Sequence, residues 1–226
     1  LLDLRGILDV CIITNGRSSF EYVNKSIREQ KNVIFDTHII RDKKWVDANN
    51  ICLELCSSKH FLRVDDDMLL HNLSLCFIGS EILKRQDDRT CFFLWRLWQP
   101  STSEIVNGIK AYNVDLTKKI GGFKENQIGK IDKLFFAKVL DKKLGIVGYK
   151  ECVIGIHMSC DAEETLRYSR MRGEHLSKKF KTKEEKIRRM GKYPKSLNDQ
   201  YLMLNELVKL NSKSQSRFYN FVQNNV

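Results

Sequence analysis

Three short apolar runs alternate with two amphipathic stretches over the first 64 residues, and this alternation restricts the fold more than any other feature. Residues 6–14, 33–40 and 61–64 are rich in β-branched and other apolar side chains, as strands buried on both faces are. Between them, residues 20–30 and 45–55 carry apolar side chains at helical spacing. A β-α-β-α-β order with right-handed crossovers predicts an α/β fold, in which helices flank a mainly parallel central sheet.

The same periodicities continue along the chain. Helical spacing recurs over residues 69–83 and 132–140, and strand-like runs occupy residues 91–98, 105–114 and 153–158. Gly121-Gly122 marks a turn before the second of these helices. We therefore expect one main domain over residues 1–160.

The character of the chain changes from residue 161, where Lys and Arg become dense. Helical patterns cover residues 163–173, 181–190 and 197–210. These patterns predict a basic helical C-terminal extension over residues 161–226, packed on the main domain or on a partner.

Composition and charge narrow the possible partners. The net charge is +11, and the excess of basic residues is concentrated after residue 165. Such a charge is compatible with nucleic acid, an anionic membrane surface or a phosphate-bearing ligand as the partner. Little aromatic interleaving and the lack of a recognition motif argue against nucleic acid. No apolar run approaches the roughly 18 residues that span a bilayer, and no signal peptide is visible. The chain begins without Met, as a piece of a longer protein would.

The seven cysteines are odd in number and include no C-x-x-C pair. Most lie in apolar runs, where a free thiol behaves as a small hydrophobe. This usage predicts a reducing, cytoplasmic setting, to which the basic extension adds a peripheral contact with the inner face of a membrane. Cys52 and Cys56 are one helical turn apart and could touch a metal, although the helix pattern already explains them as core residues.

Three consecutive carboxylates, Asp65, Asp66 and Asp67, end the third predicted strand. Adjacent anions repel one another, so a cation or an array of donors is expected beside them. At the carboxyl edge of an open α/β sheet they suit a hard divalent metal. A solvated acidic turn, in which Asp67 caps the following helix, explains the triplet as well.

Several segments together carry a resemblance to a known family. They are residues 9–17, residues 20–30, Ile39-Ile40-Arg41-Asp42, the Asp65–Asp67 triplet as a D-x-D element, and Ile120-Gly121-Gly122-Phe123 as a G-G-F turn. In this order and spacing the chain resembles a GT-A-fold glycosyltransferase of the large inverting family 2, which uses nucleotide-sugar donors. The resemblance covers about residues 8–160. It implies a donor-binding half over about residues 1–70 and an acceptor-binding half over about residues 71–160.

The resemblance also implies roles for single residues. Donor contacts are expected from Thr14, Asn15, Arg17 and Asp42. Asp67 is expected to bind the metal, and Asp65 to contact the metal or the donor ribose. Because side chains alternate in an extended segment, Asp66 points elsewhere while remaining in the donor-binding segment.

His157 and Asp132 complete the expected site. His157 follows a late strand, where related enzymes often supply a further metal ligand, although it could equally be a polar strand terminus. The family usually carries an acidic pair after G-G-F, and here Ile131-Asp132 keeps only the second acid. Asp132 is thus the expected general base, and a plain helix N-cap is its alternative.

These roles describe a metal-dependent inverting glycosyltransferase. It would use Mn²⁺ or Mg²⁺ and move a sugar from a nucleoside-diphosphate sugar to a hydroxyl of a saccharide or lipid-linked acceptor. A sugar-nucleotide nucleotidyltransferase is an alternative, although Asn15-Gly16-Arg17 is short and glycine-poor for that class. The other alternative is a basic nucleic-acid-binding module. The basic extension could also dock the enzyme to an anionic membrane or a neighbouring domain.

Overall fold

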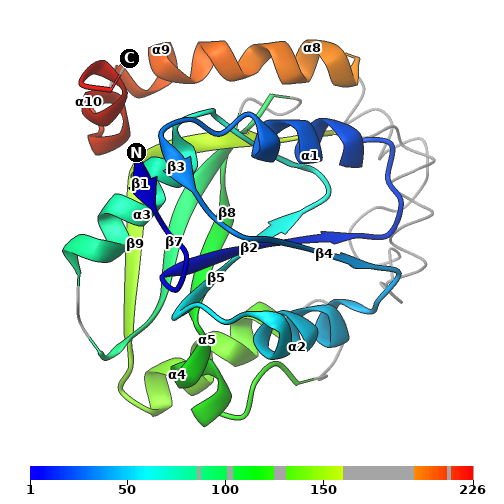
Figure 1. Ribbon diagram of the computed structural model, residues 1–226, viewed down its shortest axis with the longest axis vertical. Helices are drawn as coiled ribbons and strands as arrows, with labels where there is room; N and C mark the ends of the chain where they lie inside the picture. The colour runs from blue at the N-terminus through cyan, green and yellow to red at the C-terminus, as the bar shows by residue number, and fades with distance from the viewer. Residues whose placement is uncertain (86–87, 101–103, 125–130, 160–195, 213–214, 226) are drawn as a thin grey trace.

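A computed structural model describes residues 1–85, 88–100, 104–124, 131–159, 196–212 and 215–225 of the chain. Within these residues a seven-stranded sheet runs through the molecule in the order β4-β2-β5-β8-β7-β9-β6 (Figure 1). The strands are β2 Leu8–Thr14, β4 Thr37–Arg41, β5 His60–Asp65, β6 Met68–Leu70, β7 Thr90–Gln99, β8 Glu104–Asn113 and β9 Gly145–His157.

The sheet is mixed, which corrects the prediction of a mainly parallel one. β2 pairs in parallel with β4 and β5, and β7 pairs in parallel with β9. The β5–β8, β7–β8 and β6–β9 pairs are antiparallel. The first strands, which helices connect, pair in parallel as predicted. β7 and β8 are joined by a short connection and therefore pair antiparallel. The α/β class itself is confirmed.

Helices cover both faces of the sheet (Figure 1). They include α1 Phe20–Arg28, α2 Trp45–Leu55, α3 Ser74–Lys84, α4 Val114–Lys119 and α5 Ile131–Asp141. One apolar cluster packs α1 and α3 on one face, and a second packs α2, α4 and α5 on the other. Alternation along β5 feeds both clusters, because Leu62 and Val64 join the first and Phe61 the second.

Two predicted elements differ from the structure. The strand expected over residues 33–40 is split into β3 Val33–Ile34, which pairs with β1 Leu2–Asp3 in a small second sheet, and the edge strand β4. The helix expected over residues 69–83 begins only at Ser74. The residues before it form β6, because their backbone groups pair with β9.

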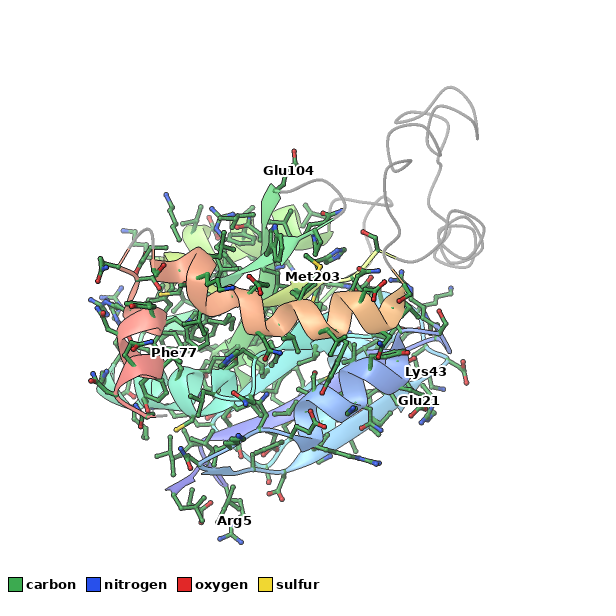
Figure 2. All side chains as sticks on the ribbon, turned by 90° about the horizontal axis from the view of Figure 1, so that it is seen from above. Arg5, Glu21, Lys43, Phe77, Glu104 and Met203 are labelled. Atoms are coloured by element: carbon green, nitrogen blue, oxygen red, sulfur yellow. The ribbon has the colours of Figure 1, made fainter. Side chains whose placement is uncertain are left out.

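The end of the chain packs on the main domain. It forms α8 Leu197–Leu202, a 3₁₀ helix Met203–Glu206, α9 Leu207–Ser212 and α10 Arg217–Gln223. Buried side chains of these helices, including Leu207 and Phe218, join the cluster that packs α1 and α3. Figure 2 shows the segment with Met203 lying across the molecule and Phe77 beside α10, where the Phe77 and Phe218 ring centroids are 5.2 Å apart.

The expected helices over residues 163–173 and 181–190 lie outside the described residues. Across the described part of the chain, no helix has both the length and the apolar character that crossing a membrane requires.

Candidate active site

Several of the expected site residues lie at the ends of strands, at one edge of the sheet. β2, β4 and β5 run in parallel, so their carboxyl ends meet there, with Ile13 in register with Asp65 and Thr14 with Arg41. The Asp42 backbone N–H donates a 3.1 Å hydrogen bond to the Thr14 carbonyl. In Figure 2 the labels Glu21 and Lys43 mark this end of the molecule. Open α/β sheets bind ligands at such an edge.

Asp66 anchors the loop between β2 and α1. Its side chain is 2% exposed, and its Oδ2 accepts hydrogen bonds from the Thr14 hydroxyl at 2.9 Å and the Asn15 N–H at 3.0 Å. The Arg17 Nε lies 3.4 Å from Asp66 Oδ1. Burial raises the pKa of Asp66, and the Arg17 charge opposes that shift. With its oxygens engaged by the loop, Asp66 acts as a positioning residue for the segment expected to meet the donor.

Asp67 faces His157 across the β6–β9 pair. The two strands place Met68 in register with His157, and the Met158 N–H donates to the Asp67 carbonyl at 2.7 Å. Asp67 Oδ1 lies 3.9 Å from His157 Nε2, and Arg17 donates to Asp67 Oδ2. Because a strand and not a helix follows Asp67, the alternative role as a helix cap is excluded.

Asp65 is held by a residue that the sequence patterns do not single out. Arg63 Nη2 donates to Asp65 Oδ2 at 3.1 Å, and the guanidinium carbon lies 4.8 Å from the Trp45 ring centroid. Asp65 Oδ1 is buried and accepts no hydrogen bond within the described structure. Strand alternation places Arg63 and Asp65 on the same side of β5, and that is the signal by which Arg63 could have been found.

The geometry of Asp67 and His157 fits one shared cation. Two ligand atoms that are each about 2.1 Å from Mg²⁺ or a similar ion lie at most about 4.2 Å apart, so a separation of 3.9 Å is compatible with a common ion. Asp65 does not complete a set of three with them. Within the described residues the one group of three metal-ligating atoms, all within 4.8 Å of one another, is Asp9, His38 and Cys56. A small hard ion commonly takes one or two side chains and fills its other positions with phosphate oxygens and water.

The G-G-F turn is fastened to α2. Gly121 and Gly122 have φ angles of 87° and 62°, which favour glycine. The side chain of Asn50 donates from Nδ2 to the Phe123 carbonyl at 2.9 Å and accepts from the Phe123 N–H at 3.0 Å. Asn50 has no sequence signal, because its partners are 73 residues away. α5 begins at Ile131 and carries Asp132 in its first turn, while the Asp132 side chain lies outside the described structure.

Comparisons with known proteins give similarity at the level of structure. The sequence matches no protein-family model and no curated protein. The structure is similar to TarS 1–349 from S. aureus, with a TM-score of 0.53 and 13% identity over 74% of this chain and 64% of that chain. A complex of TarS 1–349 with UDP-GlcNAc gives a TM-score of 0.54 and 12% identity over 90% of this chain and 81% of that chain.

A second similar protein is the mannosyltransferase PcManGT from Pyrobaculum calidifontis, solved with GDP-Man and Mn²⁺. Its TM-score is 0.54 and its identity 12%, over 98% of this chain and 79% of that chain. The match to the longer TarS structure spans only 39% of that chain. At such low identity these similarities define the fold, and the fold resemblance read from the sequence is confirmed. The chain therefore adopts the GT-A fold of glycosyltransferases.

Proposed function

We propose that this chain is a metal-dependent inverting glycosyltransferase that moves a sugar from a nucleoside-diphosphate sugar to a hydroxyl of a saccharide or lipid-linked acceptor. The observation that carries the proposal is the 3.9 Å approach of Asp67 Oδ1 to His157 Nε2 at the ligand-binding edge of a GT-A fold. Similar structures were solved with a nucleotide sugar, and one of them also with Mn²⁺.

Asp67 and His157 would hold Mn²⁺ or Mg²⁺. When bound, such an ion neutralises the charge of the departing diphosphate. Arg17 contributes a second positive charge on the same side, because its guanidinium already contacts both Asp66 and Asp67. Asp65, with one oxygen on Arg63 and the other buried without a hydrogen-bond partner in the described structure, is suited to contact the donor ribose. Thr14, Asn15 and Asp42 border the same edge, where the donor would lie.

Asp132 is proposed as the general base. It would take the proton of the acceptor hydroxyl while that oxygen bonds to the anomeric carbon. The bond between the anomeric carbon and the diphosphate oxygen breaks on the opposite side, which inverts the configuration. The start of α5 favours the anionic form of a carboxyl in its first turn, so Asp132 would be ready to accept a proton near neutral pH.

Donor binding tests the metal assignment. Thermal unfolding is followed with UDP or GDP, with Mn²⁺, and with both together, in the starting protein, in Asp67→Asn and in the control Asp88→Asn. Asp88 is a suitable control because its side chain is 92% exposed and pairs only with the surface Lys59 among described residues. We expect nucleotide and metal together to raise the melting temperature more than either does separately. Asp88→Asn should keep this synergy and Asp67→Asn should lose it. An unchanged synergy in Asp67→Asn would contradict the assignment of Asp67 to the metal.

Turnover tests the base and the reaction class. Removing a general base typically costs about 10²–10⁴-fold, so Asp132→Asn should lose that much turnover while keeping the nucleotide-dependent shift. The anomeric configuration of the product, read by NMR, distinguishes inversion from retention. Release of pyrophosphate from a nucleoside triphosphate and a sugar 1-phosphate, without any sugar transfer, would instead identify a nucleotidyltransferase.

The proposed membrane contact involves residues outside this site. Arg167, Arg170 and Arg172 belong to the basic stretch outside the described residues. Binding of the full chain to vesicles with and without anionic lipid, measured by co-sedimentation, tests the peripheral contact. A neighbouring domain is the other partner that this basic stretch would suit.

A further inference from the structure

A cluster of metal-ligating side chains lies at the opposite end of β2 from the candidate active site. Asp9 and Cys11 point to the same side of β2 by strand alternation, and Cys11 is in register with His38 on β4. Cys56 joins them as the residue that ends α2. Thr14 is five positions further along β2 than Asp9, about 17 Å at the rise of a strand, so this cluster is separate from the donor edge.

The atoms of the cluster converge on one point. One ligand atom from each of Asp9, His38 and Cys56 lies within 4.8 Å of the other two. His38 Nε2 is 3.4 Å from Asp9 Oδ2 but is buried and makes no hydrogen bond within the described residues. Three ligands arranged tetrahedrally around zinc lie roughly 3.3–3.8 Å apart, so only a small contraction would close the group around an ion.

Asp9 is oriented for this role by the chain that follows α2. Its side chain is fully buried, and its Oδ2 accepts from the Ser57 N–H at 3.0 Å and the Ser58 N–H at 3.4 Å. The Ser58 hydroxyl donates to Asp9 Oδ1. Carboxylates that bind metals are usually held by such outer hydrogen bonds. A buried carboxylate is also costly unless a cation or donors accompany it.

We propose that Asp9, His38 and Cys56 bind a borderline-soft divalent cation of the Zn²⁺ type, at a site distinct from the hard-metal site of Asp67 and His157. A mixed set of sulfur, imidazole nitrogen and carboxylate oxygen suits zinc, whereas Mg²⁺ and Mn²⁺ favour oxygen ligands. The His38 side chain is 28% exposed, so the cluster lies close to the surface although the His38 Nε2 itself is buried.

Cys11 lies next to the proposed site and contacts one of its ligands. Its Sγ lies 3.3 Å from the Cys56 Sγ, where it can donate its S–H to a Cys56 thiolate. An ion held here links β2, the edge strand β4 and the end of α2. Its role is therefore to stabilise this corner of the sheet.

Cobalt(II) tests the proposal, because a cobalt–thiolate bond adds a charge-transfer absorption in the near ultraviolet. The full chain is titrated with cobalt and then with zinc as competitor, in an Asp67→Asn background that removes the other expected site. We expect one equivalent of cobalt with the thiolate band, displaced by zinc. Loss of an outer-shell partner commonly costs about 10–100-fold in affinity, so His38→Gln, which removes a direct ligand, should cost roughly 100-fold or more.

Matched variants make the result specific. Cys56→Ser should abolish the thiolate band, and Cys76→Ser, which changes another buried thiol on α3, should leave it intact. His38 is partly exposed, so His38→Gln gives a decisive result even if Cys56→Ser does not fold. A band that persists unchanged in His38→Gln, or cobalt bound without any thiolate band, would overturn the proposal. The proposal would also be overturned if the protein were isolated with a Cys11–Cys56 disulfide and still bound no cobalt after that disulfide had been reduced.

Discussion

At the scale of single residues, Asp66 is the member of the acidic triplet that holds the local structure together. Its buried carboxylate receives the Thr14 hydroxyl and the Asn15 N–H and pairs with Arg17. Leaving buried donors without their acceptor costs about 1–3 kcal/mol. We expect Asp66→Ala to lower the free energy of unfolding by that amount, measured by urea denaturation at pH 7.

A double-mutant cycle separates this anchoring role from a general loss of packing. Thr14→Val removes one of the donors to Asp66 and should cost about 1 kcal/mol by itself. If the two side chains act together, the double variant should lose less than the sum of the single losses, by about 0.5–1 kcal/mol. Strict additivity would show that Asp66 stabilises the protein by other contacts.

At the scale of elements, the G-G-F turn depends on α2. Asn50 satisfies both backbone groups of Phe123, so Asn50→Ala should cost about 1–3 kcal/mol of stability. Because α5 and Asp132 follow the turn, the same variant should lower turnover while nucleotide binding remains. Urea denaturation and a transfer assay on the same preparation measure the two effects.

Two glycines, Gly122 in this turn and Gly148 in β9, provide a matched pair of variants. A Cβ on Gly122 would lie 2.9 Å from Asn50 Oδ1, at a φ of 62°, so Gly122→Ala should destabilise the protein by roughly 1–2 kcal/mol or more. A Cβ on Gly148 would meet nothing within 4 Å, and Gly148→Ala should be close to neutral. Equal losses in the two variants would contradict a special role for this turn.

The elements also show how far the sequence predicts the fold. Helical and strand periodicity predicted α2 with its bounds, and it placed the acidic triplet at the carboxyl end of β5. β6 was missed because its three apolar residues have no periodicity of their own and become a strand only through their pairing with β9. Contacts such as Asn50 with Phe123 and Arg63 with Trp45 depend on residues far apart in sequence, which no local pattern encodes.

At the scale of the whole molecule, the two halves of the sheet explain why the candidate site is only partly visible in the sequence. The position of Asp65 and Asp66 follows directly from the parallel half of the sheet, where the carboxyl ends of the strands meet. The approach of His157 to Asp67 depends on the antiparallel β6–β9 pair, which lies on the opposite side of the sheet from β4. The family resemblance supplied His157, and the pairing supplies the physical reason for its position.

Two buried histidines give the whole molecule a pH-dependent stability. Burial lowers the pKa of His60 and of His71 from 6.5 to about 4. The His71 Nδ1 accepts the Leu73 N–H at 3.3 Å, which requires the unprotonated nitrogen. The unfolded chain therefore binds more protons than the folded one between pH 6.5 and about 4, so stability is full above pH 6.5 and falls as the pH drops through this window.

Unfolding in urea at pH 7 and pH 5 measures this loss, which should be roughly 2 kcal/mol for each histidine. His71→Asn keeps an acceptor near the position of Nδ1 but cannot be protonated in this range. It should therefore reduce the difference in unfolding free energy between pH 7 and pH 5 by roughly 2 kcal/mol, the contribution of one histidine. The His60→Asn variant should do the same, and the double variant should remove most of the difference. A pH dependence that is unchanged in both single variants would show that other groups cause the acid destabilisation.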